Sequence, residues 1–399
     1  MERLGTYIEQ VYRTNADLRY GLDDVRGVSN TKEMMQSRAN LIGRTFEKFL
    51  VISPGDFVFN RRTTRNGEKI GMAFNNTDRD YIFTEDYVAF KVKDDCKAAL
   101  LPEYLYLFFR RSEFDRYARY MSTGSATEFF NWEDMCNVPF TPPTMEFQEK
   151  MVRAMTTLEH RISVLQQIND NLAETIKAIF KSWFLDFNAL ENIELVQSQY
   201  GFIPDGWHYA LLGDLCECVT KGTTPTTLGK DFTEAGINFI KGESINDDHS
   251  FNKALFAHID DETDELLKRS RIYENDIVFT IAGTLGKFAL VDSSVVPANT
   301  NQAVAIIRTS KITPEMLYSY FIGEWQVEFY KKNTQQAVQA NLSLGTIKDL
   351  PILLPDNEGQ ARYMKLVTPL IAGIKTNFAE IERLYDLQNQ LLARLSSSR

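Results

Sequence analysis

The side chains best suited to binding chemistry lie in a short basic segment at residues 61–69. It reads Arg-Arg-Thr-Thr-Arg-Asn-Gly-Glu-Lys, which places four cations against one acid between two strand-like segments. Arginine can fork onto guanine O6 and N7, asparagine onto adenine, and lysine or threonine onto phosphate. A solvated turn is the alternative interpretation. If the segment contacts DNA, the residues involved are expected to be Arg61, Arg62, Thr63, Arg65, Asn66 and Lys69.

Polar loops in the second half of the chain offer similar chemistry. Residues 282–287 form a turn with two glycines and one cation, and further loops occur at 221–224, 299–302 and 335–339. Amide and hydroxyl side chains are ordinary in loops, so each segment alone is a weak signal. The candidate DNA-binding residues in these loops are Lys221, Thr223, Thr224, Thr284, Lys287, Asn301, Gln335, Gln336 and Gln339.

The sequence offers no convincing catalytic or metal site. Asn-Val-Pro-Phe at 137–140 resembles the Asn-Pro-Pro-aromatic motif of amino-methyltransferases, but no glycine-rich motif for S-adenosylmethionine accompanies it. Gly-Thr-Leu-Gly-Lys at 283–287 is too short for a phosphate loop and lacks the following Ser or Thr. The four histidines and four cysteines have neither metal nor triad spacing. We therefore expect a chain that is not an enzyme and holds no metal or cofactor.

An internal repeat organises the chain. The segment 101–109, Leu-Pro-Glu-Tyr-Leu-Tyr-Leu-Phe-Phe, matches 313–321, so Pro102 answers Pro314 at an offset of 212 residues. The same offset aligns Gln148 with Gln360 and residues 123–127 with 335–339, and it sets the motif at 137–140 against Asp-Leu-Pro-Ile at 349–352. With small slips in register, Asp56 answers Asp276. The repeat predicts two related units, 4–187 and 212–399, whose unlike loops would read different sequences.

Each unit ends in a segment with a helical heptad pattern. Apolar residues recur at steps of three and four from Met151 to Trp183 and again from Tyr363 to Leu395, which favours two long helices that pair. Forty helical residues extend about 60 Å. The seam predicted to serve the helix pair or a partner includes Met155, Leu158, Ile162, Leu165, Leu370, Ile374, Ile381 and Leu384.

Three polar residues interrupt this seam, namely Asn169, Asn377 and Gln388. A buried Asn in a coiled coil commonly fixes the register or orientation of the helices at a cost in stability. A solvated notch is the alternative.

These patterns predict an α+β fold with pseudo-twofold symmetry, in which two mixed α/β bodies are separated by two long antiparallel coiled-coil helices. The predicted bodies are 1–144 and 212–356, the helices are 145–187 and 357–399, and 188–211 is the join.

Composition limits the class of protein. The net charge of −10 argues against a protein that coats nucleic acid, so any DNA contact must be local. No apolar run is long enough to span a bilayer, and the amino terminus lacks the pattern of a signal peptide. We expect a cytoplasmic protein without a membrane partner.

The order of several short motifs around the two heptad segments resembles the specificity subunit of type I restriction-modification systems over essentially the whole length. The motifs are Gly-Val-Ser-Asn at 27–30, Ser-Arg-Ala-Asn at 37–40, Ser-Pro-Gly-Asp at 53–56, Leu-Pro-Glu-Tyr-Leu at 101–105, Arg-Ser-Glu-Phe-Asp-Arg-Tyr at 111–117, Asn-Trp-Glu-Asp-Met at 131–135, Pro-Asp-Gly-Trp at 204–207, Lys-Gly-Thr-Thr-Pro at 221–225 and Asn-Leu-Ser at 341–343. No single motif is decisive.

The resemblance implies that each body is a target recognition domain that reads one half of a bipartite double-stranded DNA site. It implies that the helices set the spacing and dock two methyltransferase subunits, which methylate adenine N6 with S-adenosylmethionine. Motor-nuclease subunits would add ATP- and Mg-dependent translocation and cleavage. The residues alone leave two rivals, a coiled-coil adaptor that never touches DNA and a free-standing adenine methyltransferase, of which the second suffers from the missing cofactor motif.

Overall fold

The computed structural model describes residues 2–29, 31–37, 41, 43–62, 69–123, 128–191, 193–327 and 342–397. The chain divides into two compact units. Unit 1 comprises Met1–Ser163 and Glu382–Arg399, and unit 2 comprises Val164–Ile381. Unit 1 therefore draws on both ends of the sequence.

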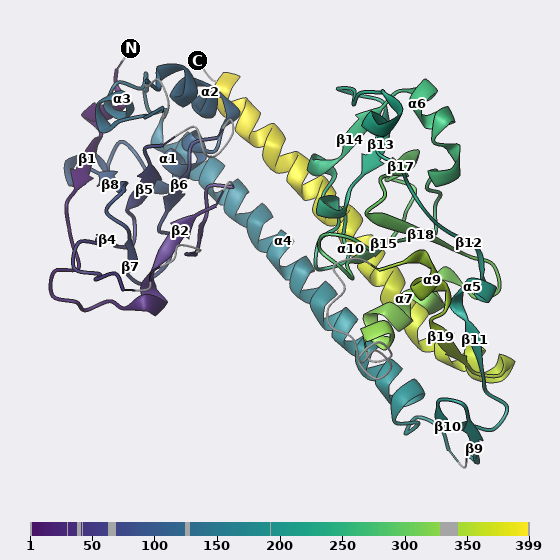
Figure 1. Ribbon diagram of the computed structural model, residues 1–399. Helices are drawn as coiled ribbons and strands as arrows, with labels where there is room; N and C mark the ends of the chain where they lie inside the picture. The colour runs from purple at the N-terminus through teal and green to yellow at the C-terminus, as the bar shows by residue number, and fades with distance from the viewer. Residues whose placement is uncertain are drawn as a thin grey trace. The chain divides into compact units, whose positions relative to one another are not determined.

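Unit 1 is built on an antiparallel sheet of order β1-β8-β5-β6 (Figure 1). Aromatic side chains recur along its strands, and Phe57 pairs in register with both Phe90 and Phe74. The main strands are β1 (Ile8–Val11), β5 (Phe57–Asn60), β6 (Met72–Phe74) and β8 (Tyr87–Val92). Two further antiparallel pairs join β2 (Arg26–Val28) with β3 (Met34–Gln36), which follow each other in the chain, and β4 (Leu50–Ile52) with β7 (Tyr81–Phe83), which do not. The short helices are α1 (Pro102–Phe109), α2 (Ser112–Met121) and α3 (Trp132–Cys136).

Unit 2 repeats this framework with a sheet of order β12-β18-β15-β16, also antiparallel throughout. Those strands are β12 (Cys216–Lys221), β15 (Ile277–Thr280), β16 (Phe288–Leu290) and β18 (Val304–Thr309). A second sheet joins β14 (Ala257–Ile259), β13 (Ile237–Ile240) and β17 (Ala298–Thr300), and two pairs join β9 (Leu195–Ser198) with β10 (Gly201–Pro204) and β11 (His208–Leu211) with β19 (Pro351–Leu354). The short helices are α5 (Leu212–Leu215), α6 (Asp261–Leu266), α7 (Pro314–Ile322) and α9 (Leu344–Lys348).

The two sheets share a detailed turn as well as an order of strands, which confirms the predicted repeat. The backbone N–H of Asp56 donates to Ser53, and that of Asp276 donates to Tyr273. Each buried carboxylate also accepts from the backbone N–H of that same earlier residue, at 2.7 Å and 2.8 Å. Arginine completes both sites, since Arg13 pairs with Asp56 and Arg308 with Asp276.

Two long helices contribute to the cores of both units. They are α4 (Met145–Phe180), followed by a wider turn at Lys181–Leu185, and α10 (Asn357–Ser397). In unit 1, Met151 and Met155 of α4 belong to the same core as Leu395 of α10. In unit 2, Ile176 of α4 shares a core with Ile371 and Ile374 of α10. Each unit therefore closes its core with one end of each helix.

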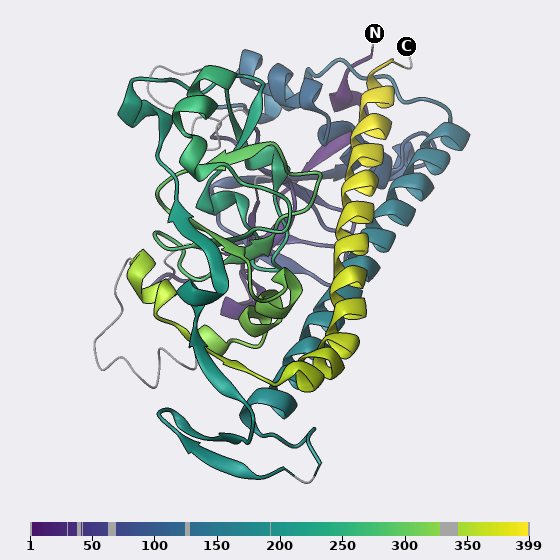
Figure 2. The same ribbon diagram turned by 90° about the vertical axis from the view of Figure 1, so that its right-hand side faces the viewer.

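In unit 2 the pairing of α4 with α10 is antiparallel (Figures 1 and 2). Asn377 donates to Asn169 at 2.7 Å, Leu172 lies beside Gly373, and the Trp183 ring contacts the Tyr363 ring. Along these three contacts the residue number rises on α4 while it falls on α10, as an antiparallel pair requires. The α+β class, the two repeated units and the two long helices are thus confirmed.

The polar breaks in the seam are buried, and the solvated-notch alternative is wrong for two of them. Asn169 and Gln388 are each only 5 % exposed. Because Asn169 accepts a hydrogen bond from Asn377 inside the helix pair, the pair is a candidate for fixing register between these two helices.

A buried lysine ties four segments of unit 1 together. Lys32, between β2 and β3, is 3 % exposed, and its ammonium donates to the Phe109 carbonyl at 2.8 Å and to Asp115 Oδ1 at 2.6 Å. The same carboxylate oxygen accepts from the backbone N–H of Ile70 at 3.1 Å. Burial lowers the pKa of Lys32, and the Asp115 carboxylate opposes that shift. These hydrogen bonds hold α2 against Ile70, which directly follows the basic segment at 61–69.

Charge placed on the helix seam should destabilise unit 2. Ile374 is 4 % exposed in the core, so Ile374→Asp buries a carboxylate without a partner and should cost at least about 3 kcal/mol of unfolding free energy. Leu366→Asp on the same helix is the control, because that side chain is 46 % exposed and the change should cost below about 1 kcal/mol. Urea unfolding of both variants decides, and equal costs would contradict the packing described.

Removing the buried ammonium of Lys32 alone should lower the free energy of unfolding more than removing the whole ion pair. Lys32→Met leaves the Asp115 carboxylate buried without its counter-charge, which we expect to cost about 3–5 kcal/mol. Adding Asp115→Asn removes the stranded charge and keeps an oxygen for the Ile70 N–H, so the double variant should recover stability. The midpoints of urea unfolding measure this, and simple additivity of the two changes would refute the coupling.

Unit 2 should lose stability in mild acid through His249. Its ring is partly buried and stacks on Phe288 with centroids 3.9 Å apart, and burial lowers the His249 pKa below 6.5, against weaker opposing effects of Asp248 and Asp247. Below pH 6.5 the unfolded chain then binds the proton more readily, so stability falls until the lower folded-state pKa is reached. His249→Phe keeps a ring to stack and should flatten the change in urea midpoint between about pH 7.5 and about pH 5.5. Equal slopes in the two proteins would exclude His249 as the cause.

Candidate nucleic-acid interface

The basic segment of unit 1 leaves the sheet at the end of β5. Arg61 is exposed and Arg62 half-exposed, with the Arg62 guanidinium 3.8 Å from the Asp86 carboxylate. The Arg61 carbonyl accepts from the backbone N–H of Phe130 at 2.9 Å, which holds the base of the segment against residues 128–130. Lys69 is exposed where the chain returns toward β6. The predicted contacts Thr63, Arg65 and Asn66 lie outside the described residues.

Helix α2 adds cations beside Lys69 that the sequence reasoning missed. Arg116, Arg119 and Tyr120 are exposed on this helix, and together with Lys69 they line one pocket of about 610 Å³. Their spacing was a usable signal, because other residues of the same helix, Phe114, Asp115 and Ala118, are buried. A hydrophobic face at helical spacing would have shown which arginines point outward.

In unit 2 the turn between β15 and β16 occupies the place of the basic segment in unit 1. Thr284 is exposed at its tip, and the turn is shaped by Gly283 and Gly286, with φ of +75° and +85°. The Lys287 ammonium lies 2.9 Å from Asp247 Oδ1, so part of its charge is met by a neighbouring loop. Ion pairs this exposed are weak, and Lys287 can exchange partners.

Two of the other predicted loops come together beside β12. The backbone N–H of Gly222 donates to the Asn301 carbonyl at 3.1 Å, and the Thr224 hydroxyl donates to Gln302 Oε1 at 2.6 Å. A side chain at position 222 would collide with the Thr300 carbonyl, 1.7 Å from the site of a Cβ. Lys221 is exposed and Thr223 half-exposed in the same place. Gln335, Gln336 and Gln339 lie outside the described residues.

Half of the segment 299–302 belongs to the core, which corrects the view of it as an exposed recognition loop. Asn299 and Thr300 are wholly buried. Asn299 donates to Asp264 at 3.0 Å and accepts from the Ser270 hydroxyl at 2.7 Å, while Thr300 donates to the Ile240 carbonyl. Only Asn301 and Gln302 keep surface in contact with solvent.

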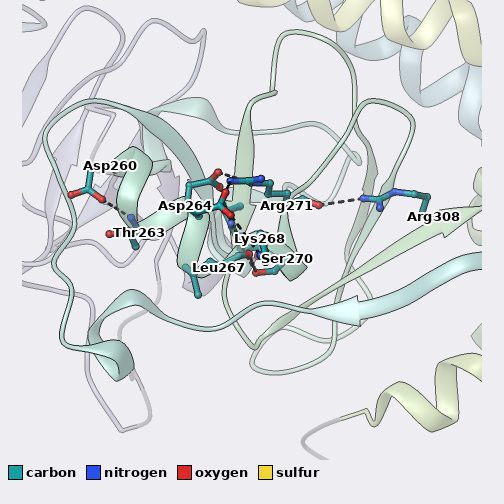
Figure 3. A network of polar contacts seen from close by, with 11 residues as sticks. Asp260, Thr263, Asp264, Leu267, Lys268, Ser270, Arg271 and Arg308 are labelled. Atoms are coloured by element: carbon teal, nitrogen blue, oxygen red, sulfur yellow. Dashed lines mark hydrogen bonds and ion pairs between the residues drawn. The ribbon is translucent and has the colours of Figure 1, made fainter.

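These bonds are part of a larger polar network that fixes the second sheet of unit 2 (Figure 3). Arg271 pairs with Asp264 at 2.6 Å, and Arg308 donates to the Arg271 carbonyl at 3.2 Å while it pairs with Asp276. Burial raises the pKa of Asp276, and the Arg308 guanidinium opposes the rise. Fully bonded side chains of this kind hold a scaffold rather than a ligand.

The predicted seam residues face the interior of the protein. Met155, Ile162, Ile374, Ile381 and Leu384 are buried, and Leu158, Leu165 and Leu370 are partly buried. Side chains that are already buried within this chain are not available to contact a partner protein. Of the two roles proposed for them, the buried positions fit the helix pair, and a partner would need the outer faces.

Those outer faces keep exposed apolar side chains. In unit 2 these are Val164 and Ile168 on α4 and Leu366 on α10, and in unit 1 they are Tyr385 and Leu387 on α10. Unit 2 also exposes Leu195 and Phe202 on the β9–β10 hairpin, which projects from the rest of that unit (Figure 2).

Within the described parts of the chain, three or more metal-ligating side chains do not gather anywhere. Burial raises the pKa of the Cys216 thiol to about 12, which disfavours the reactive thiolate. No helix among the described residues is both long and apolar enough to cross a membrane.

Comparison with known proteins gives a consistent result. The model of the type I restriction modification DNA specificity domain matches residues 28–174 and 204–384. The chain is 23% identical over 305 residues to the type I restriction enzyme MjaIX specificity subunit of Methanocaldococcus jannaschii, covering 75% of this chain and 69% of that protein. It is also 23% identical over 409 residues to the HindI specificity subunit of Haemophilus influenzae, covering 86% of each.

The fold agrees with this assignment. The crystal structure of the type I restriction-modification S subunit from M. genitalium superposes with a TM-score of 0.50 at 13% identity, over 98% of this chain and 94% of that one. Since the family model covers most of the sequence in two copies, this chain belongs to the family of type I restriction-modification DNA specificity proteins.

Proposed function

We propose that each unit of this specificity protein reads one half of a bipartite DNA target. The observation that carries the proposal is that the two units share a scaffold but differ in their loops. Sheets β1-β8-β5-β6 and β12-β18-β15-β16 have the same order and the same buried-aspartate turn. The hairpin between their third and fourth strands carries Arg61, Arg62 and Lys69 in unit 1 but Thr284 and Lys287 in unit 2. Different donors in the same place favour different base sequences.

The long helices would set the distance between the half-sites. Each helix is continuous from one core into the other, and the hydrogen bond between buried Asn169 and partly buried Asn377 resists a slip of one helix along the other in unit 2. Spacing would then be a property of helix length and register.

We propose that the outer faces of the same helices dock two methyltransferase subunits. Val164, Ile168 and Leu366 in unit 2, with Tyr385 and Leu387 in unit 1, are exposed apolar side chains of the kind that a helix of a partner would cover. In this proposal the partner binds S-adenosylmethionine and methylates adenine N6, and motor-nuclease subunits bind ATP and Mg. This chain then contributes recognition and no catalytic group. A cytoplasmic location stays a prediction.

A coiled-coil adaptor that never touches DNA is the alternative from another class. It would use the same helices but has no need for two scaffolds with divergent polar loops. The loops therefore favour DNA reading over the adaptor function.

Selection from a randomised duplex library tests the proposal. With the methyltransferase partner present, the complex should enrich two short motifs at one fixed spacing, because two different bodies are joined by helices of fixed length. Omitting this chain is the control and should enrich nothing. A single contiguous motif, or none, would refute bipartite reading, and none would favour the adaptor.

A further inference from the structure

The pocket on α2 of unit 1 shares only Lys69 with the hairpin candidates for base reading. It has a volume of about 610 Å³ and is lined by Lys69, Ser112, Asp115, Arg116, Arg119, Tyr120 and Glu128. A volume of this size admits a phosphate group with part of its sugar.

Four of the lining residues come from one exposed face of α2. Ser112, Arg116, Arg119 and Tyr120 follow each other at steps of four, three and one, while Phe114 and Ala118 bury the opposite face in the core of unit 1. Tyr120 is 86 % exposed although its ring is large and apolar. The helix therefore presents two guanidinium groups, a hydroxyl and a ring from a rigid base.

The charged side chains in and beside this pocket sum to a positive charge. Asp115 is met by the buried Lys32 ammonium at 2.6 Å, so it adds no net negative charge. Glu113 lies 3.7 Å from Arg116 at the surface, and Glu128 is the other acid. Three cations, Lys69, Arg116 and Arg119, face these two carboxylates.

The buried lysine reports the same positive surroundings. Burial is the main cause of its lowered pKa, but Lys69 and Arg110 push it in the same direction. Cations therefore lie near one another in this part of unit 1, which favours the approach of an anion.

We propose that this pocket anchors the DNA backbone by taking one phosphate group, with Arg116 and Arg119 as the principal cations, Lys69 as a further one, and Ser112 as a hydroxyl donor. Apart from the carboxylates of Asp115 and Glu128, the described lining residues offer cations and hydroxyl groups to an anion, and none of these described residues is an amide of the kind that reads adenine. Tyr120 would pack on the sugar. The anchor would position unit 1 on the duplex without reading its sequence.

The inference rests on the proposed function, because it assigns a role within DNA binding by unit 1. It adds residues on α2 that the hairpin candidates do not include, and an attachment that is independent of sequence.

The test measures the salt dependence of DNA binding by the full chain in complex with its methyltransferase partner. Arg116→Gln/Arg119→Gln should lower the slope of log affinity against log salt by about 0.9 for each phosphate that the variant no longer neutralises. The decrease should be the same on a duplex with the selected target and on one without it. Arg153→Gln is the matched control, since Arg153 is an exposed arginine of the same unit, paired with Glu149 on α4, and should leave the slope unchanged.

Two further variants guard against a folding artefact. Arg116→Gln alone should give a partial decrease in slope, and Arg116→Lys should keep most of the wild-type slope because the charge remains. Urea midpoints equal to wild type show that the variants fold.

Three other outcomes separate the anchor from the function on which it rests. An unchanged slope in the double variant excludes a phosphate in the pocket and overturns the proposal. A decrease confined to the target duplex means that these arginines read bases, which overturns it as well. If the wild-type complex selects no target but binds both duplexes with a slope that the double variant lowers, bipartite reading fails and the anchor stands.

Discussion

The burial of one apolar face along each long helix is the constraint on which the rest of the structure depends. Unit 1 does not close its core with a continuous stretch of chain, because its core includes Leu395 from the end of α10 as well as Met151 from the start of α4. Unit 2 is continuous, and its core includes Ile176 of α4 and Ile374 of α10 from near its two ends. Most helical stability in proteins comes from the packing of an apolar face, so the cores stabilise the helices as much as the helices complete the cores.

This arrangement separates scaffold from surface. The buried aspartates, Asp56 and Asp276, end their turns in the same hydrogen bonds, and Gln148 and Gln360 each donate to a proline carbonyl five residues earlier, at 2.8 Å and 2.9 Å. Such contacts hold the strands that flank the loops. The loops themselves can then differ in charge and length without disturbing the core, as two readers of different half-sites require.

The sequence predicted the features that depend on local pattern and repetition. The match of Pro102 with Pro314 located α1 and α7, and the heptad steps located α4 and α10. Features that depend on long-range contacts were not predictable. The burial of Asn299 depends on Asp264 and Ser270, which lie about thirty residues away in the chain. The tie from Lys32 to Asp115 joins residues whose sequence separation of 83 leaves no local signal.

The central claim is that the two units are separate readers with different targets, and an exchange of one unit tests it most directly. Residues 212–356 of this chain would be replaced by the corresponding segment of a relative with a different target, and adenine methylation would be mapped across a genome in cells that supply the methyltransferase partner. The account predicts that one half of the methylated motif changes while the other half and the spacing stay as they were. A motif that is unchanged, or altered in both halves, would contradict it.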